Sequence, residues 1–222
     1  WAHASFTASP QGEYAVEFGE GVRRGEPAVA IAVENHGDGA LTVNTGAAVY
    51  TFKSEELLPS RATMGETVVL ADAGGGAYLV DNRGRTARVS GERADVESKI
   101  HTRGPARVVV RRAGWYVTPN GERVARAKMW FYFAAGVPYV RMTHTLALTE
   151  NTNQRWVRDY GLTFRKPESA RQVTFALSEP APLEGQTIDE LRRSSDDTAE
   201  DRALMYSGMH GRSWRTFAVK PD

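Results

Sequence analysis

The chain has 222 residues, no cysteine, and a near balance of 28 lysine and arginine residues against 27 aspartate and glutamate residues. Its length and its 41% hydrophobic content suffice for one large domain with an ordinary core. The absence of cysteine excludes disulfides, thiolate nucleophiles and cysteine zinc sites. The near-neutral charge argues against nucleic acid as a partner, and no apolar run is long enough to predict contact with a membrane.

Short runs of alternating apolar and polar residues, separated by glycine, proline and asparagine, predict an all-β protein, an antiparallel barrel or sandwich. The predicted strands, in chain order, are 13–18, 28–34, 41–45, 47–52, 67–71, 77–80, 86–90, 106–112, 115–118, 123–133, 139–148, 160–165, 172–177 and 213–219. Turn residues at 82–84 and 119–121 predict hairpins. The two longest strands, 123–133 and 139–148, are expected at the centre of the sheet.

Residues 180–204 depart from the strand pattern. They open with Pro180-Ala181-Pro182, and Thr187 is placed to cap a short helix with Asp189 and Glu190 in its first turn. We interpret this stretch as an excursion from the sheet, so residues 1–222 are predicted to form a single β domain.

The strand 123–133 carries the clearest candidate binding surface. On one face it places apolar side chains, and on the other it places Arg126, Lys128, Trp130 and Tyr132. Aromatic rings stack on the C–H patches of sugars, and cations neutralise the carboxylate of acidic sugars, so this face could bind a uronate-containing chain. The alternative is that Trp130 and Tyr132 pack beneath a second sheet, with the cationic side chains running along them.

The strand 139–148 adds Arg141 and His144 as candidate substrate-binding residues. His144 falls in an apolar stripe, where it could remove a proton or could be a hydrogen-bonded core histidine. No spaced group of histidines and carboxylates predicts a metal, and no glycine-rich loop or serine elbow predicts a cofactor or a hydrolase triad. Neither a metal nor a cofactor is expected, and no catalytic residue is assigned.

Several motifs together resemble the N-terminal β-barrel domain of the exo-rhamnogalacturonan lyase-like (PcRGLX-like) family. The motifs are Leu41–Ala47, Gly114-Trp115-Tyr116, Pro119-Asn120-Gly121, Ala127–Phe133, Ala134-Ala135-Gly136, Tyr139–Thr145 and Asp159–Leu162. The resemblance covers most of positions 1 to 165. It implies that the chain begins inside its domain, and that a longer parent continues into a helical toroid and further β modules.

The resemblance also implies a function. The parent would be a polysaccharide lyase that acts by β-elimination on uronate-containing pectic chains, and this domain would be a scaffold or a glycan-contacting module. Its partners would be polysaccharide or neighbouring domains of the same chain, in a secreted, cell-surface or periplasmic protein. Another hypothesis is a structural β subunit of an extracellular assembly, completed by strand exchange with a neighbouring chain. A complete small glycosidase or lyase would require converging acid and base groups in one cleft.

Overall fold

The structure is a computed structural model that describes residues 20–21, 28–71, 76–151, 153–165, 167, 172–177 and 215–220, the last two segments as backbone only. Within these residues the regular structure is antiparallel strand, apart from one turn of 3-10 helix. This confirms the predicted all-β antiparallel fold. None of the helices found in this part of the chain is long and apolar enough to cross a membrane. The predicted strand 13–18 and the predicted helix after Thr187 lie outside the described residues.

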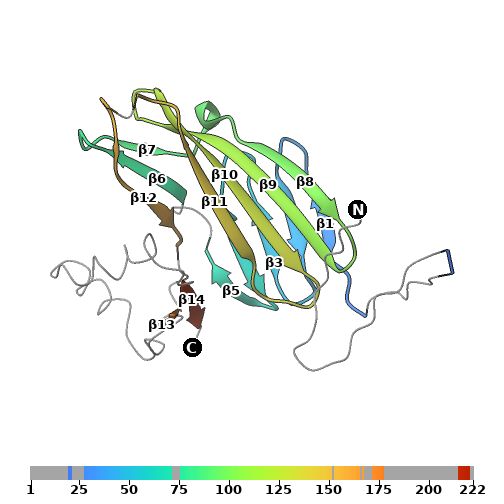
Figure 1. Cartoon of the computed structure of the whole chain (residues 1–222). Helices are drawn as coiled ribbons and strands as arrows, with labels where there is room; N and C mark the ends of the chain where they lie inside the picture. The colour runs from blue at the N-terminus through green and yellow to red at the C-terminus, as the bar shows by residue number, and fades with distance from the viewer. Residues whose placement is uncertain are drawn as a thin grey trace.

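Two sheets hold almost all of the strands (Figure 1). The first sheet follows chain order and contains β1 (Ala32–Asn35), β2 (Leu41–Asn44), β3 (Val49–Phe52), β4 (Arg61–Met64) and β5 (Thr67–Leu70). The second sheet has the order β11-β10-β9-β7-β6-β12, and β8 also pairs with β9. Its strands are β6 (Gly76–Asp81), β7 (Thr86–Arg88), β8 (Glu97–Arg103), β9 (Arg107–Val117), β10 (Arg123–Ala134), β11 (Arg141–Leu148) and β12 (Val157–Thr163). The 3-10 turn η1 (Glu92–Ala94) joins β7 to β8, and β13 (Gln172–Leu177) pairs with β14 (Arg215–Lys220).

The core lies between the first sheet and the long strands β9 and β10. Phe52 of β3 meets Phe131 of β10 with ring centroids 5.0 Å apart, and Tyr50 meets Phe133 at 5.2 Å. All four side chains are buried. Burial of such rings supplies most of the free energy that holds two sheets face to face.

One end of the sandwich is closed by hydrogen bonds between two hairpins. Thr45, which follows β2, donates from its hydroxyl to the carbonyl of Val137 at 2.8 Å. The Tyr50 hydroxyl donates to the carbonyl of Pro138 at 2.7 Å, and burial raises the pKa of this phenol to about 12. The loop between β10 and β11 is therefore fixed to the first sheet at this end.

A buried arginine joins the sheets at another point. Arg112 of β9 projects into the core, is fully buried, and lies with its guanidinium carbon 5.4 Å from the centroid of the Phe52 ring. It donates to the carbonyls of Gly39 at 2.8 Å, Lys53 at 2.6 Å and Ser54 at 3.0 Å, all in loops of the first sheet. Burial lowers its pKa to about 10, so the guanidinium is still charged at neutral pH. One side chain of the second sheet thus holds two loops of the first.

The sequence missed two strands and divided a third. β4 was not predicted, and neither was β8, whose side chains are mostly polar and exposed and so lack apolar alternation. The predicted segments 106–112 and 115–118 form the single strand β9, which runs through Gly114. Glycine is needed at this position because a Cβ would not fit. A Cβ there would lie 2.8 Å from Val89 and 3.0 Å from Val96.

The expected centre of the sheet was also wrong. β10 pairs with β9 on one side and β11 on the other, but β11 pairs with no further strand in the described structure. β11 is an edge strand, and most of its polar side chains are exposed. The long central pair is β9 with β10.

We predict that Arg112→Ala lowers the free energy of unfolding by roughly 3 to 5 kcal/mol, because it leaves a cavity and removes charged hydrogen bonds from three loop carbonyls. Chemical denaturation followed by circular dichroism measures this loss. Lys128→Ala, at an exposed position on the next strand, is the control and should cost less than about 1 kcal/mol. Equal losses in the two variants would contradict the role of Arg112.

Candidate functional site: a cationic face on the second sheet

Successive side chains of β9 and β10 point to opposite faces of the sheet, and this determines which of them face solvent. Trp130 pairs with Arg111 and Tyr132 pairs with Val109, so these four side chains share the face opposite to the core. The first sheet packs on the other face, that of Phe131 and its neighbours. The alternative that Trp130 and Tyr132 pack beneath a second sheet is therefore wrong for the described part of the chain.

This outer surface, which we call the cationic face, gathers positive and aromatic side chains from β8, β9, β10 and β11. Its members are Lys99, His101, Arg107, Arg111, Trp115, Arg123, Arg126, Lys128, Trp130, Tyr132 and Arg141. Glu97 and Asp95 form ion pairs with three of these cations, Arg111, Arg126 and Arg123, and the cations of the face outnumber these two carboxylates. Val109 and Ala113 are buried under these side chains although they point away from the core.

Aromatic rings hold several of the guanidinium groups in place. The guanidinium carbons of Arg107 and Arg141 lie 5.5 and 5.7 Å from the ring centroid of Tyr132. Those of Arg123 and Arg126 both lie 5.5 Å from the ring centroid of Trp115. Such stacking restricts the long side chains, and the edges of the Arg123 and Arg126 guanidinium groups donate to the exposed carboxylates of Asp95 and Glu97. The rings act here mainly as supports for arginines.

Glu97 of β8 lies between two of the arginines. Its carboxylate is 3.6 Å from Arg111 and 3.3 Å from Arg126, and its side chain is 53% exposed. An exposed pair of this kind contributes little to stability. Glu97 therefore occupies donors that an external carboxylate could also use.

Trp130 makes a different contact. Its ring lies 4.6 Å from that of His101, tilted by 55°, and it is only partly buried. His101 reaches this position because β8 has an irregularity between Ile100 and Thr102. The sequence did not select His101, Arg107, Arg111 or Trp115, because the pairing of β8 and β9 with β10 is a tertiary feature.

The structure brings five of the six predicted binding residues to one face and separates the sixth. Arg126, Lys128, Trp130, Tyr132 and Arg141 belong to the cationic face. His144 pairs with Met129 and lies on the opposite, inner face of the sheet.

On that inner face His144 has a structural partner. Its Nε2 lies 3.2 Å from the hydroxyl of Tyr116, a fully buried residue of β9, and its ring is 6.1 Å from that of Tyr160. Burial lowers the pKa of His144 and raises that of Tyr116, so both groups are neutral at pH 7. The contact gives a hydrogen-bond partner to the buried Tyr116 hydroxyl and to the half-buried His144 ring, which is consistent with the core interpretation of His144.

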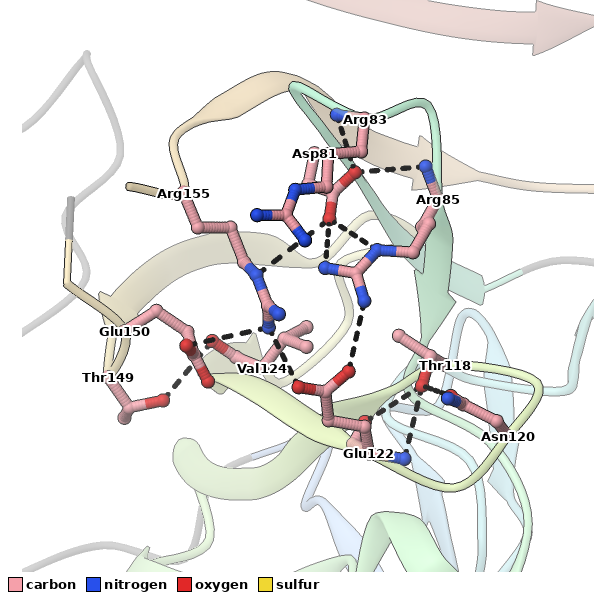
Figure 2. A network of polar contacts seen from close by, with 10 residues as sticks. All are labelled: Asp81, Arg83, Arg85, Thr118, Asn120, Glu122, Val124, Thr149, Glu150 and Arg155. Atoms are coloured by element: carbon pink, nitrogen blue, oxygen red, sulfur yellow. Dashed lines mark hydrogen bonds and ion pairs between the residues drawn. The ribbon is translucent and has the colours of Figure 1, made fainter. Parts of the chain in front are cut away.

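A second polar cluster lies where three connections of the second sheet meet (Figure 2). Asp81 at the end of β6 accepts hydrogen bonds from the backbone NH groups of Arg83 and Arg85, each at 2.9 Å. The Arg85 guanidinium also contacts Asp81 at 2.7 Å and Glu122 at 3.2 Å. Arg155, in the connection between β11 and β12, contacts Glu122 at 3.0 Å and Glu150 at 3.4 Å.

The carboxylates of this cluster are held in their charged form. Burial alone would raise the pKa of Asp81, but the hydrogen bonds and charge of Arg85, with the NH of Arg83, outweigh it and lower this pKa. The hydrogen bond from Arg155 lowers the pKa of Glu122. Each carboxylate already has cationic partners, so the cluster fastens three loops together and offers no proton donor for chemistry.

No group of three or more histidine, aspartate and glutamate side chains suited to a metal ion is found among the residues that the structure describes. The cationic face is the candidate site, and its cluster of positive side chains suits an anionic ligand.

With this geometry established, the chain can be compared with known proteins. The family model described as "PcRGLX-like protein central beta sandwich domain" matches residues 31–182. The chain belongs to the PcRGLX-like family. Neither a curated protein nor a solved structure matches it.

The match confirms the family that the strand motifs suggested, and its β-sandwich description agrees with the two packed sheets. It assigns the chain to the central β sandwich of the family, whereas the motifs pointed to the N-terminal barrel. Motifs such as Gly114-Trp115-Tyr116 and Pro119-Asn120-Gly121 are strand and hairpin features, and these recur in any antiparallel β domain. They therefore do not distinguish one β domain of the family from another.

We predict that the Asp81 cluster makes stability depend on acid. Because the folded-state pKa values of Asp81 and Glu122 are lowered, their contribution is complete above the unfolded values near pH 4 and is lost as the pH falls through the folded values. Asp81→Asn should cost about 2 to 4 kcal/mol at pH 7 and flatten the loss of stability between roughly pH 5 and pH 2. Denaturation midpoints measured across this range test the prediction.

Glu66→Gln, at an exposed hairpin position of the first sheet, is the control for that series. Its free energy of unfolding should depend on pH as that of the unsubstituted protein does. If Asp81→Asn loses stability in acid as steeply as the unsubstituted protein, the cluster does not cause the loss of stability at low pH.

Proposed function

We propose that this domain is a non-catalytic, glycan-contacting module of a polysaccharide lyase-like protein, and that its cationic face binds uronate-containing chains. The observation that carries the proposal is the gathering of cations and aromatic rings on one outer face, where the Arg123 and Arg126 guanidinium groups stack on Trp115. A polysaccharide ligand would place the parent protein outside the cell or in the periplasm.

The chemistry of the face suits carboxylates that repeat along a polymer. Arginine donates two parallel hydrogen bonds to a carboxylate, and prior stacking reduces the entropy lost when it does so. From Arg123 to Tyr132 the strand advances about 30 Å at roughly 3.3 Å per residue, which is long enough for several sugar units. A chain lying along β9 and β10 would therefore meet successive cations.

Trp130 supplies an apolar contact between these cations. It is partly exposed, and a sugar ring presents C–H groups that pack well on an indole. Arg111 and Lys128 belong to the same face, so a uronate held at Trp130 would have a cation within reach for its carboxylate.

The same reasoning argues against β-elimination at this surface. That reaction requires a base placed to remove the C5 proton beside a clamped carboxylate. The face is an open sheet surface on which the exposed His101 ring lies against Trp130, with no cleft formed around it by the described residues to hold a sugar against a base. The Tyr116–His144 pair lies on the other side of the sheet, with Tyr116 fully buried. We therefore assign the domain a binding role and place the chemistry elsewhere in the parent.

We predict that the 222-residue protein binds polygalacturonate in low-salt buffer, and that the affinity falls as ionic strength rises. Lys128→Glu should weaken binding about tenfold, since a charge-assisted contact is lost and a repulsion is gained. Lys53→Glu changes the net charge equally but lies on the first sheet, and should change the affinity less than twofold. Isothermal titration calorimetry measures both.

Glu97→Gln provides the opposite test, because it releases Arg111 and Arg126 and should tighten binding severalfold. Equal binding of neutral dextran, or equal effects of the two lysine reversals, would contradict the proposal. Large assemblies that bind no glycan, seen by light scattering, would favour the structural subunit instead.

A further inference from the structure

A pocket of about 620 Å³ opens at one end of the cationic face. It is an open hollow lined by β7, by the η1 turn and by the hairpin that joins β9 to β10. Its lining includes Thr86, Arg88, Ser90, Arg93, Val117 and Asn120. The volume is within the range of small-molecule sites, and it suits a single sugar unit.

The pocket and the cationic face lie on the same side of the sheet. Val117 pairs with Arg88 of β7 and with Arg123 of β10, and direct cross-strand pairs share a face. Val117 also follows Trp115 by two residues on β9, so both side chains point outward. A polysaccharide that lies over Trp115 and Arg123 therefore reaches the pocket on the same side of the sheet.

The lining combines the groups that recognise an acidic sugar. Arg88 and Arg93 are exposed cations, Thr86 and Ser90 carry hydroxyls, and the half-buried Val117 gives an apolar floor. Glu92 is the single carboxylate in the lining and is exposed. A uronate ring offers a carboxylate, hydroxyls and a C–H patch, which match these three kinds of group.

Two features of the hairpin shape the wall. Gly121 has φ +86°, and a Cβ at that position would overlap the guanidinium of Arg93, so Arg93 packs directly against the hairpin backbone. The Thr118 hydroxyl donates to the side-chain oxygen of Asn120, which leaves the Asn120 amide nitrogen as the group that can donate to a ligand. The hairpin thus forms one wall of the pocket.

We infer that this pocket binds one uronate unit of the glycan at the point where the chain reaches the β9–β10 hairpin. Arg88 and Arg93 contact the carboxylate, and Thr86, Ser90 and Asn120 hydrogen-bond the hydroxyls. The inference rests on the proposed function for the identity of the polymer, but it concerns a separate set of residues.

The test uses the 222-residue protein with galacturonate and galactose as monosaccharide probes, followed by saturation-transfer NMR and calorimetry. Galacturonate should bind at least tenfold more tightly than galactose. Arg93→Gln and Arg88→Gln should each weaken galacturonate binding about tenfold, and Lys53→Gln should leave it unchanged. Lys128→Glu should also leave monosaccharide binding unchanged while it weakens polygalacturonate.

These arms separate the two proposals. If polygalacturonate binds through Lys128 but galacturonate does not bind, or binds equally well to Arg93→Gln, the pocket is overturned and the cationic face is not. If galacturonate binds as expected but Lys128→Glu leaves polymer binding intact, the face is overturned and the pocket is not. Equal affinity for galactose would overturn the role of the two arginines.

Discussion

The buried guanidinium of Arg112 is the contact on which the rest of the structure depends. A charged group inside a core is costly unless it is paired, and here three loop carbonyls of the facing sheet accept hydrogen bonds from its two terminal nitrogens. These partners exist on one side of β9 only. Because successive residues of a strand point to opposite faces, fixing Arg112 inward forces Arg111 and Ala113 outward. A register slip by one residue would bury Arg111 in place of Arg112, so the core fixes the cationic face.

The two faces of the long β9–β10 pair differ in what their side chains contact. The inner face, with Phe131 and Phe133, packs against the first sheet. The outer face needs no side chain for stability beyond those that shield Val109 and Ala113, so it can carry charge at little cost. Guanidinium groups stacked on aromatic rings meet both demands, since the rings cover the sheet and the charges face solvent. Such a surface fits a binding module better than a catalytic cleft.

The sequence predicted the parts of this arrangement that depend on local alternation. The outward row from Arg126 to Tyr132 follows from a period of two within one strand, and the structure confirms which side chains share that face. It could not predict which neighbours would complete the face. β8 is too polar to be recognised as a strand, and Gly114 divides β9 in the pattern although its missing Cβ is what lets the strand continue past Val89. Arg141 and His144 were both selected as binding residues on one strand. Residues three apart on a strand point to opposite faces, so the two side chains lie on different sides of the sheet.

The most direct test of this account is to titrate the isotope-labelled 222-residue protein with oligogalacturonate and map the NMR shift changes. The account predicts that changes in backbone amide and arginine side-chain signals concentrate in β8 to β11 and the β9–β10 hairpin, and that added salt reverses them. Changes centred on the first sheet or around Tyr116 and His144, or no change at concentrations that saturate the polymer, would contradict it.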